Sequence, residues 1–189
     1  MLELVYPSEP ARLVAGAECT KKEEMLPVVD ARGFVTSQAP RSYCHGPHRP
    51  LHPVVHLQII NRKGEIYLQH RSASKKIYPL HWDTAVGGHV SYGEYITESL
   101  YREAGEELGF FDFNPIFVDS YIHESDVECE LVCLFAAVGD FCIDPCNDEV
   151  TEGRWWTAGE LMDSVGKDIL TPLFEQEFKT YKDKLLALL

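Results

Sequence analysis

One stretch organises the rest of this sequence: Gly88-His-Val-Ser-Tyr-Gly-Glu94-Tyr-Ile-Thr-Glu-Ser-Leu-Tyr-Arg102-Glu103-Ala104-Gly105-Glu106-Glu107-Leu108-Gly109-Phe110. Apolar residues recur within it every four positions, at Ile96, Leu100, Ala104 and Leu108. This period predicts a helix from Glu94 with one buried face, and Gly109 is a typical residue to end it.

Three carboxylates lie close together on this helix. At about 100° per residue, Glu103 and Glu107 share one line along the helix and Glu106 lies one step around it. Like charges four residues apart destabilise a helix by about 0.2–0.5 kcal/mol, and a divalent cation removes that repulsion. Because all the ligands are oxygens, the pattern favours Mg²⁺ or Mn²⁺. Such a metal neutralises diphosphate oxygens and orients water.

The spacing Gly-x5-Glu-x7-Arg-Glu-U-x-Glu-Glu-x-Gly-U, where U is apolar, resembles the Nudix box. All seven fixed identities are present, which chance would produce about once in 10⁸ to 10⁹ windows at ordinary residue usage. The resemblance implies an α+β fold, the Nudix-type α/β/α sandwich with a mixed β-sheet. It also implies a metal-dependent hydrolase that cleaves a diphosphate linkage in a nucleoside-diphosphate-type or other organic diphosphate.

The resemblance assigns roles to particular residues of this chain. Glu103, Glu106 and Glu107 are then catalytic metal ligands, and the carbonyl of Gly87 joins them. Gly88 allows a tight turn, while Glu94 and Arg102 form an ion pair that braces the loop against the helix. A further catalytic acid from a later loop is expected, and the candidates are Glu149 and its rival Glu152, with a solvated loop acid as the alternative.

Residues 26–161 also resemble isopentenyl-diphosphate isomerase and its Nudix-hydrolase relatives. That enzyme has a separate metal site, and the matching positions here hold His45, His52, His89, Glu128 and Glu130. Three imidazoles and two carboxylates suit Mn²⁺, Zn²⁺ or Fe²⁺, so the resemblance implies a second transition metal. The competing interpretation is that these groups bond locally and never converge.

Two other functions compete with hydrolysis. The isomerase uses a cysteine just before its Gly-His step, where this chain has Gly87, which carries no proton-transferring side chain. A non-catalytic Nudix-fold ligand sensor usually has a damaged box, whereas this box is whole. The substrate itself is not defined by the sequence: Arg71, Lys75 and Lys76 are candidates either for phosphate contacts or for a solvated turn.

Strand and turn patterns surround the box. Alternation and turn residues predict strands at 26–30, 34–36, 54–60, 65–70, 116–122, 128–138 and 150–157, with an irregular loop at 39–53. Helices are expected from Ala158 and from Thr171-Pro172, and the apolar face of the last one predicts core packing or a homodimer contact. We expect a single Nudix domain at 25–189 and an extension of unknown role at 1–24.

Composition limits the class of partner. The 189 residues carry a formal charge of −13, which argues against nucleic acid or an anionic membrane as a partner and favours a small-molecule diphosphate held through local cations. We expect a cytoplasmic protein, because the sequence has neither a signal-like N-terminus nor an apolar membrane span. Its six cysteines form no Cys-x-x-Cys pair and are expected to be ordinary thiols.

Overall fold

The computed structural model describes residues 2–17, 23–143, 145 and 150–189. Its elements follow the order β1 (Met25–Val29), β2 (Val35–Pro40), α1 (Arg41–Cys44), β3 (His52–Ile60), β4 (Ile66–Arg71), β5 (Trp82–Asp83), β6 (Val86–His89), α2 (Ile96–Leu108), β7 (Ile116–Glu124), β8 (Cys129–Val138), β9 (Val150–Trp156), α3 (Ala158–Ser164) and α4 (Pro172–Leu186). Among the described residues, seven strands form one sheet in the order β5-β4-β3-β8-β7, with β6 paired to β3 and β9 to β4. A mixed sheet with helices confirms the predicted α+β class.

The contacts divide the chain into two units. The first comprises Met1–Val55, Gly88–Leu100 and Asp119–Cys133, and the second comprises His56–Gly87, Tyr101–Val118 and Leu134–Leu189. No helix among the described residues has both the length and the apolar character needed to cross a membrane.

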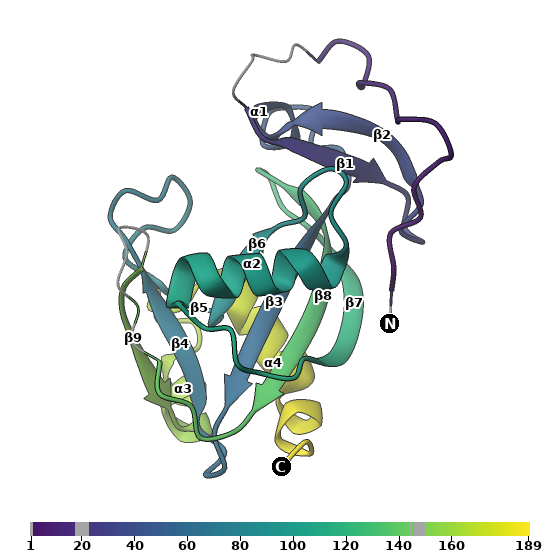
Figure 1. The fold of residues 1–189 in the computed structure, drawn as a ribbon. Coiled ribbons are helices and arrows are strands. Elements are labelled where there is room, and N and C mark those ends of the chain that lie inside the picture. Colours follow the sequence, from purple (N-terminus) through teal and green to yellow (C-terminus); the bar gives the residue numbers. More distant parts are fainter. Residues whose placement is uncertain (1, 18–22, 144, 146–149) are drawn as a thin grey trace. The chain divides into compact units, whose positions relative to one another are not determined.

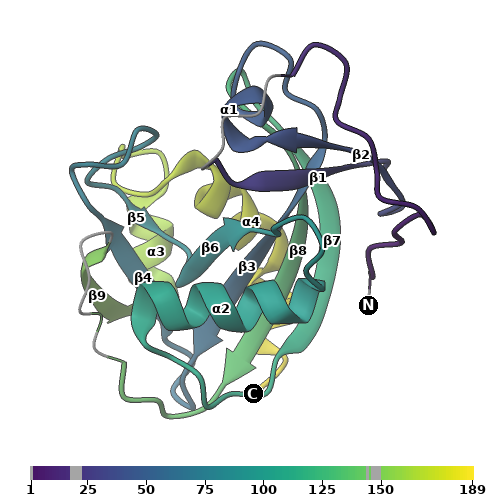
Figure 2. The ribbon, with the colours of Figure 1, turned by 45° about the horizontal axis from the view of Figure 1, so that its top comes forward.

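Strand β4 is central to the second unit. It pairs antiparallel with β3, β5 and β9, and the predicted turn before it contains Gly64 at φ +80°. In this unit the C-terminal half of α2 covers one face of the strands and α4 covers the other (Figures 1 and 2). Gly153 on β9 has to be a glycine, because a Cβ there would lie 2.0 Å from the hydroxyl of Tyr67 on the neighbouring strand.

Helix α4 starts where the sequence predicts. Thr171 caps it by accepting a hydrogen bond from the Phe174 amide at 3.3 Å, and Pro172 occupies the first turn. Phe174, Phe178 and Leu185 are buried, which confirms the core-packing interpretation of the apolar face. The homodimer contact stays a prediction.

The first unit contains a second, two-stranded sheet. Strands β1 and β2 pair antiparallel, and their buried cluster consists of Leu26, Val28, Ala39 and Cys44. The expectation of an irregular loop at 39–53 was wrong at both ends and in the middle: β2 extends to Pro40, α1 follows, and β3 begins at His52. A helix of four residues is too short for a periodic pattern to reveal it.

Residues 2–17 lie along the small sheet and contact the loop at 90–95 that leads from β6 into α2, here called the box loop. Isolated bridges join Val5 to Phe34 and Leu13 to Gln38. The hydroxyl of Tyr6 accepts a hydrogen bond from the Gly93 amide at 3.0 Å and donates one to the Glu94 carbonyl at 3.3 Å. This segment therefore has defined neighbours, although its role and the predicted boundary at residue 24 stay predictions.

Candidate active site

Helix α2 carries the box carboxylates. It begins two residues later than predicted and ends at Leu108, and the next residue, Gly109, has a φ of +61°, the left-handed conformation that favours glycine. The amide of Phe110 reaches back to the carbonyl of Ala104 at 3.1 Å and closes the last turn. The four apolar positions of the predicted stripe, Ile96, Leu100, Ala104 and Leu108, are all buried.

Glu107 is a buried carboxyl group with two defined donors. Its Oε2 accepts hydrogen bonds from the side chain of Gln69 at 2.9 Å and from the amide of Gly87 at 3.1 Å. Burial, together with the charge of Glu103, raises the pKa of Glu107 to about 7, although the Gly87 amide, Lys75 and Gln69 act in the opposite direction. Glu107 thus lies beside Gly87 and close enough to Glu103 to feel its charge, while the role of these residues as metal ligands stays a prediction.

Arg102 contacts the two other box carboxylates. Its Nη1 lies 2.7 Å from Glu103 and 3.2 Å from Glu106. The side chain of Glu106 is 61% exposed and that of Glu103 only 13%, so the three acids range from buried to solvent-facing. Glu94 accepts hydrogen bonds from Ser91 and Ser99, and its predicted ion pair with Arg102 stays a prediction.

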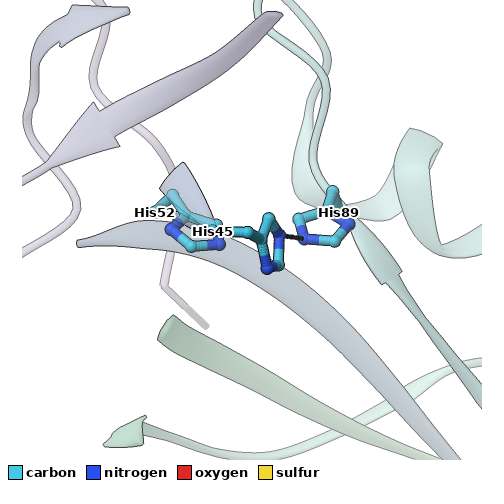
Figure 3. A group of neighbouring side chains, drawn as sticks. All are labelled: His45, His52 and His89. Atoms are coloured by element: carbon cyan, nitrogen blue, oxygen red, sulfur yellow. Dashed lines mark hydrogen bonds between the residues drawn. The ribbon is translucent and has the colours of Figure 1, made fainter. Parts of the chain in front are cut away.

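In the first unit, three histidines gather (Figure 3). Nitrogen atoms of His45, His52 and His89 all lie within 4.8 Å of one another, and the Nε2 atoms of His45 and His89 are 2.8 Å apart. The Nδ1 of His52 lies 2.9 Å from the carbonyl of Pro50. Because a carbonyl only accepts, this contact fixes the proton on Nδ1 and leaves a lone pair on Nε2.

The two acids of the predicted second ligand set lie beside these histidines. Glu128 is 3.6 Å from His45, and Glu130 is 4.0 Å from His52. Burial lowers the pKa of His52, which favours the neutral ring that binds metals. The three imidazoles therefore converge and could hold a divalent transition metal. Glu128 and Glu130 lie beside them, and the role of these two acids as ligands stays a prediction.

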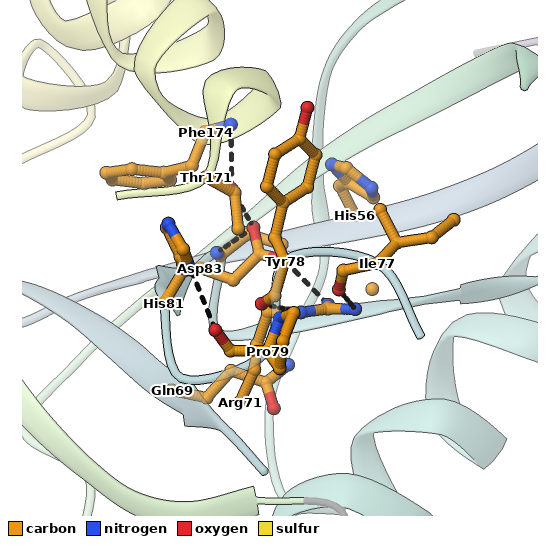
Figure 4. A network of polar contacts seen from close by, with 12 residues as sticks. His56, Gln69, Arg71, Ile77, Tyr78, Pro79, His81, Asp83, Thr171 and Phe174 are labelled. Atoms are coloured by element: carbon orange, nitrogen blue, oxygen red, sulfur yellow. Dashed lines mark hydrogen bonds and ion pairs between the residues drawn. The ribbon is translucent and has the colours of Figure 1, made fainter. Parts of the chain in front are cut away.

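A polar network fixes the loop after β4 (Figure 4). The guanidinium of Arg71 contacts the carboxylate of Asp83 at 2.9 Å and the carbonyls of Ile77 and Tyr78 at 3.0 and 3.2 Å. The other oxygen of Asp83 accepts from the hydroxyl of Thr171 at 2.7 Å. Arg71 thus holds its own loop, whereas the charge of Lys75 acts on Glu107.

Glu149, the candidate for a further catalytic acid, lies outside the described residues. Its rival Glu152 is exposed on β9, opposite His70.

Two cysteines, Cys19 and Cys146, also lie outside the described residues. Cys44 and Cys133 are buried free thiols, and burial raises the pKa of each to about 12. These two confirm the expectation of ordinary buried thiols.

Sequence reasoning missed a buried polar group in the second unit. His56 and Gln58 of β3 meet Glu177 of α4 at 2.7 and 2.8 Å. A signal was present in the sequence, because His56 and Gln58 occupy alternate positions of a strand that is otherwise apolar, and Glu177 stands on the apolar face of its helix. Polar residues at core positions usually have a partner.

Comparison with known proteins places these features in a family. Residues 50–176 match the NUDIX domain. The chain is 28% identical to an isopentenyl-diphosphate Delta-isomerase of Corynebacterium glutamicum and 30% identical to that of Corynebacterium efficiens, each over 77% of this chain and 83% of the relative. An uncharacterized Nudix hydrolase of Nostoc is 37% identical over 49% of this chain and 54% of its own length.

Solved structures agree with the fold. The protein DR0079 of Deinococcus radiodurans superposes with a TM-score of 0.70 at 22% identity, covering 86% of this chain and 99% of its own. A MutT protein of Methanosarcina mazei gives 0.61 at 23% identity, with 71% and 94% covered. With the NUDIX domain matched over most of its length and the box carboxylates on α2, the chain belongs to the Nudix family.

Proposed function

We propose that this protein is a metal-dependent hydrolase that cleaves a diphosphate linkage in a small organic diphosphate. The observation that carries the proposal is the buried carboxyl of Glu107, held by Gln69 and the Gly87 amide with the charge of Glu103 close by. Two acids in such a place repel each other and lose hydration, and a bound cation relieves both costs.

The donor set fits a hard divalent cation. Glu103, Glu106, Glu107 and the carbonyl of Gly87 are the residues that would hold Mg²⁺ or Mn²⁺, since all four offer oxygen. When bound, the metal supplies charge neutralisation for diphosphate oxygens and orientation of water. The metal would also supply the local positive charge that a chain with a formal charge of −13 needs in order to bind an anion.

The protein's own residues prepare this site. Gln69 and the Gly87 amide both donate to one oxygen of Glu107 and so fix the orientation of its carboxyl group. Arg102 orients Glu103 and Glu106 from one side chain. Glu149 remains our candidate for an additional catalytic acid on the grounds of its spacing in the sequence.

A product-release assay tests the proposal. Nucleoside diphosphate sugars, dinucleotide polyphosphates, deoxynucleoside triphosphates and isoprenoid diphosphates are each offered with Mg²⁺ or Mn²⁺, in water enriched in ¹⁸O. We expect metal-dependent cleavage of at least one class, with the label in a phosphate product. Products that lack the label would exclude hydrolysis by water.

One observation favours isomerisation as the second candidate. The convergence of His45, His52 and His89 with two acids is what the isomerase resemblance implies, and relatives at 28–30% identity are named isopentenyl-diphosphate Delta-isomerases. Against it stands Gly87, at the position where the resemblance calls for a cysteine.

The variant Gly87→Cys separates the two candidates. A Cβ at this position would lie 3.4 Å from Thr84 and 3.5 Å from His56, which is ordinary van der Waals contact. With isopentenyl diphosphate as substrate, we expect no isomer from the wild-type protein, and any isomerisation only in the variant. Isomer formed by the wild-type protein with its diphosphate intact would establish the second function.

A further inference from the structure

A cavity of about 430 Å³ lies at the C-terminal end of α2 and is lined by residues 109–112 and 140–142. Both segments belong to the second unit. Sites for small molecules typically enclose about 300–1,000 Å³, so this cavity has the size of a small ligand. It is open to solvent, because Phe111 in its wall is 66% exposed. A ligand can therefore enter it while α2 stays folded.

Aromatic rings form much of the wall. Phe110, Phe111 and Phe141 all line the cavity. The ring centroids of Phe110 and Phe141 are 4.9 Å apart, and the two rings are inclined by 67°. The ring of Phe111 lies directly against Gly105 of α2, where a Cβ would come within 2.2 Å of the ring carbon Cε1. The missing side chain of Gly105 thus lets this ring rest on the helix.

The cavity lies on the side of α2 that faces away from two of the box acids. At about 100° per residue, Gly105 is about 160° around the helix from both Glu103 and Glu107. Gly109, which lines the cavity, is only about 40° around the helix from Gly105. A ligand in the cavity is therefore distinct from a diphosphate held at the box, and the inference goes beyond the proposed function.

The charges around the cavity are mainly negative. The exposed carboxylates of Asp112 and Asp140 line it. The C-terminal end of a helix carries a partial charge of about −0.5, and the last turn of α2, which the structure describes in full, contains no basic residue. Arg62 offsets part of this charge, since its Nε is 3.7 Å from Asp140. Its side chain is 81% exposed, however, and such an ion pair is weak.

We propose that this cavity binds a small alkylammonium cation of the trimethylammonium type. Asp112, Asp140 and the end of α2 attract the positive charge, and the phenylalanine rings contact the alkyl groups. Aromatic rings attract ammonium groups that lie over their faces, and they are the usual walls of sites for quaternary ammonium ligands. The inclined rings of Phe110 and Phe141 form a corner, which suits a rounded cation better than a planar guanidinium.

A pair of ligands with the same shape tests the proposal. Choline and its neutral carbon isostere, 3,3-dimethylbutan-1-ol, are each titrated into ¹⁵N-labelled protein in the presence of Mg²⁺, and the amide signals of Gly109 and Gly87 are followed. We expect choline to change the signal of Gly109 and to bind at least about tenfold more tightly than the alcohol, as for two cation–π contacts and nearby carboxylates.

Several outcomes of this titration would overturn the proposal. Equal affinities would mean that the cavity is merely an apolar hollow, and no binding of choline would mean that it takes no ammonium ligand. A change at Gly87 in place of Gly109 would place choline at the box. Tighter binding of guanidinium than of choline would indicate a planar, arginine-like ligand.

Two conservative variants locate the binding. Phe111→Leu keeps an apolar side chain but removes the ring, and Asp112→Asn keeps the shape but removes the charge. Both positions are exposed, so the unfolding midpoints should stay close to the wild-type value. Each variant should weaken choline binding about 2- to 5-fold, and Phe111→Leu should leave binding of the alcohol unchanged.

Matched controls complete the test. Tyr95→Leu alters an aromatic residue that is 65% exposed, and Asp163→Asn alters an exposed acid of α3. Both controls should bind choline as the wild-type protein does. Wild-type affinity in Phe111→Leu and in Asp112→Asn, or an equal loss in the controls, would contradict the assignment of the site to this cavity.

Discussion

Replacing Glu107 by glutamine separates the metal role of this side chain from its structural role. The amide has nearly the same shape, and its oxygen can still accept from Gln69 and from the Gly87 amide. Burial moves the pKa of Glu107 from 4.5 to about 7. At about 1.4 kcal/mol for each tenfold change in equilibrium, ionising this carboxyl costs the metal-free folded protein about 3 kcal/mol.

The sign of this effect depends on pH. Below pH 4.5 the carboxyl is protonated in both the folded and the unfolded chain, so the cost is absent. It grows as the pH rises from 4.5 to about 7, and above that it is constant. Metal-free Glu107→Gln should therefore be more stable than wild type by up to about 3 kcal/mol at pH 8, and by much less at pH 5.

Urea unfolding in the presence of a chelator measures this difference at both pH values. Adding Mg²⁺ should then stabilise the wild-type protein and leave the variant nearly unchanged. Turnover of a true substrate should fall at least about 10²-fold in kcat. The exposed Asp183→Asn on α4 is the control. A variant less stable than wild type at pH 8, or one within a factor of three of wild-type activity, would refute the reasoning.

Three further perturbations test other parts of the structure. His52→Gln should weaken Mn²⁺ or Zn²⁺ binding at the histidine cluster by at least about tenfold in calorimetry, and unchanged affinity would mean that no metal binds there. Phe178→Ala removes a fully buried ring and should cost about 3–5 kcal/mol of unfolding free energy; a loss below about 1 kcal/mol would contradict tight packing of α4. The Thr157 amide, the Thr157 hydroxyl and Arg154 lower the pKa of Glu160 from 4.5 to about 2, so the stability lost in Glu160→Gln should be present at pH 7 and vanish as the pH falls towards 2. A stability difference in melting curves that does not change with pH would exclude that charge effect.

The parts that sequence predicted well are those with a local period. The four-residue spacing of Ile96 and Leu100 defines the buried face of α2, and that face in turn fixes where Glu103 and Glu107 point. The turn that ends in Gly64 is equally local. In such elements, residues that interact are separated by few positions, so the pattern itself contains the contact.

The parts that sequence could not predict depend on long-range pairing. His56 and Glu177 each look like a polar residue out of place in an apolar pattern, and only the packing of α4 against β3 turns the two exceptions into a pair. The histidine cluster is a different case. Its members were identified through the family resemblance, because no period links His45 to His89 or Glu128.

The contact between Tyr6 and the box loop bears on how the protein opens. Local unfolding proceeds in cooperative groups of residues, and a group need not be contiguous in sequence. The Gly93 amide donates to the Tyr6 hydroxyl, and the amide of Ala11 donates to the hydroxyl of Tyr92 at 2.8 Å. The hydrogen-exchange rate of the Gly93 amide should therefore follow the rate at which residues 2–17 detach, even though α2, which follows the loop, stays folded. The entrance to the box helix and a segment more than eighty residues upstream would then open and close as one thermodynamic unit.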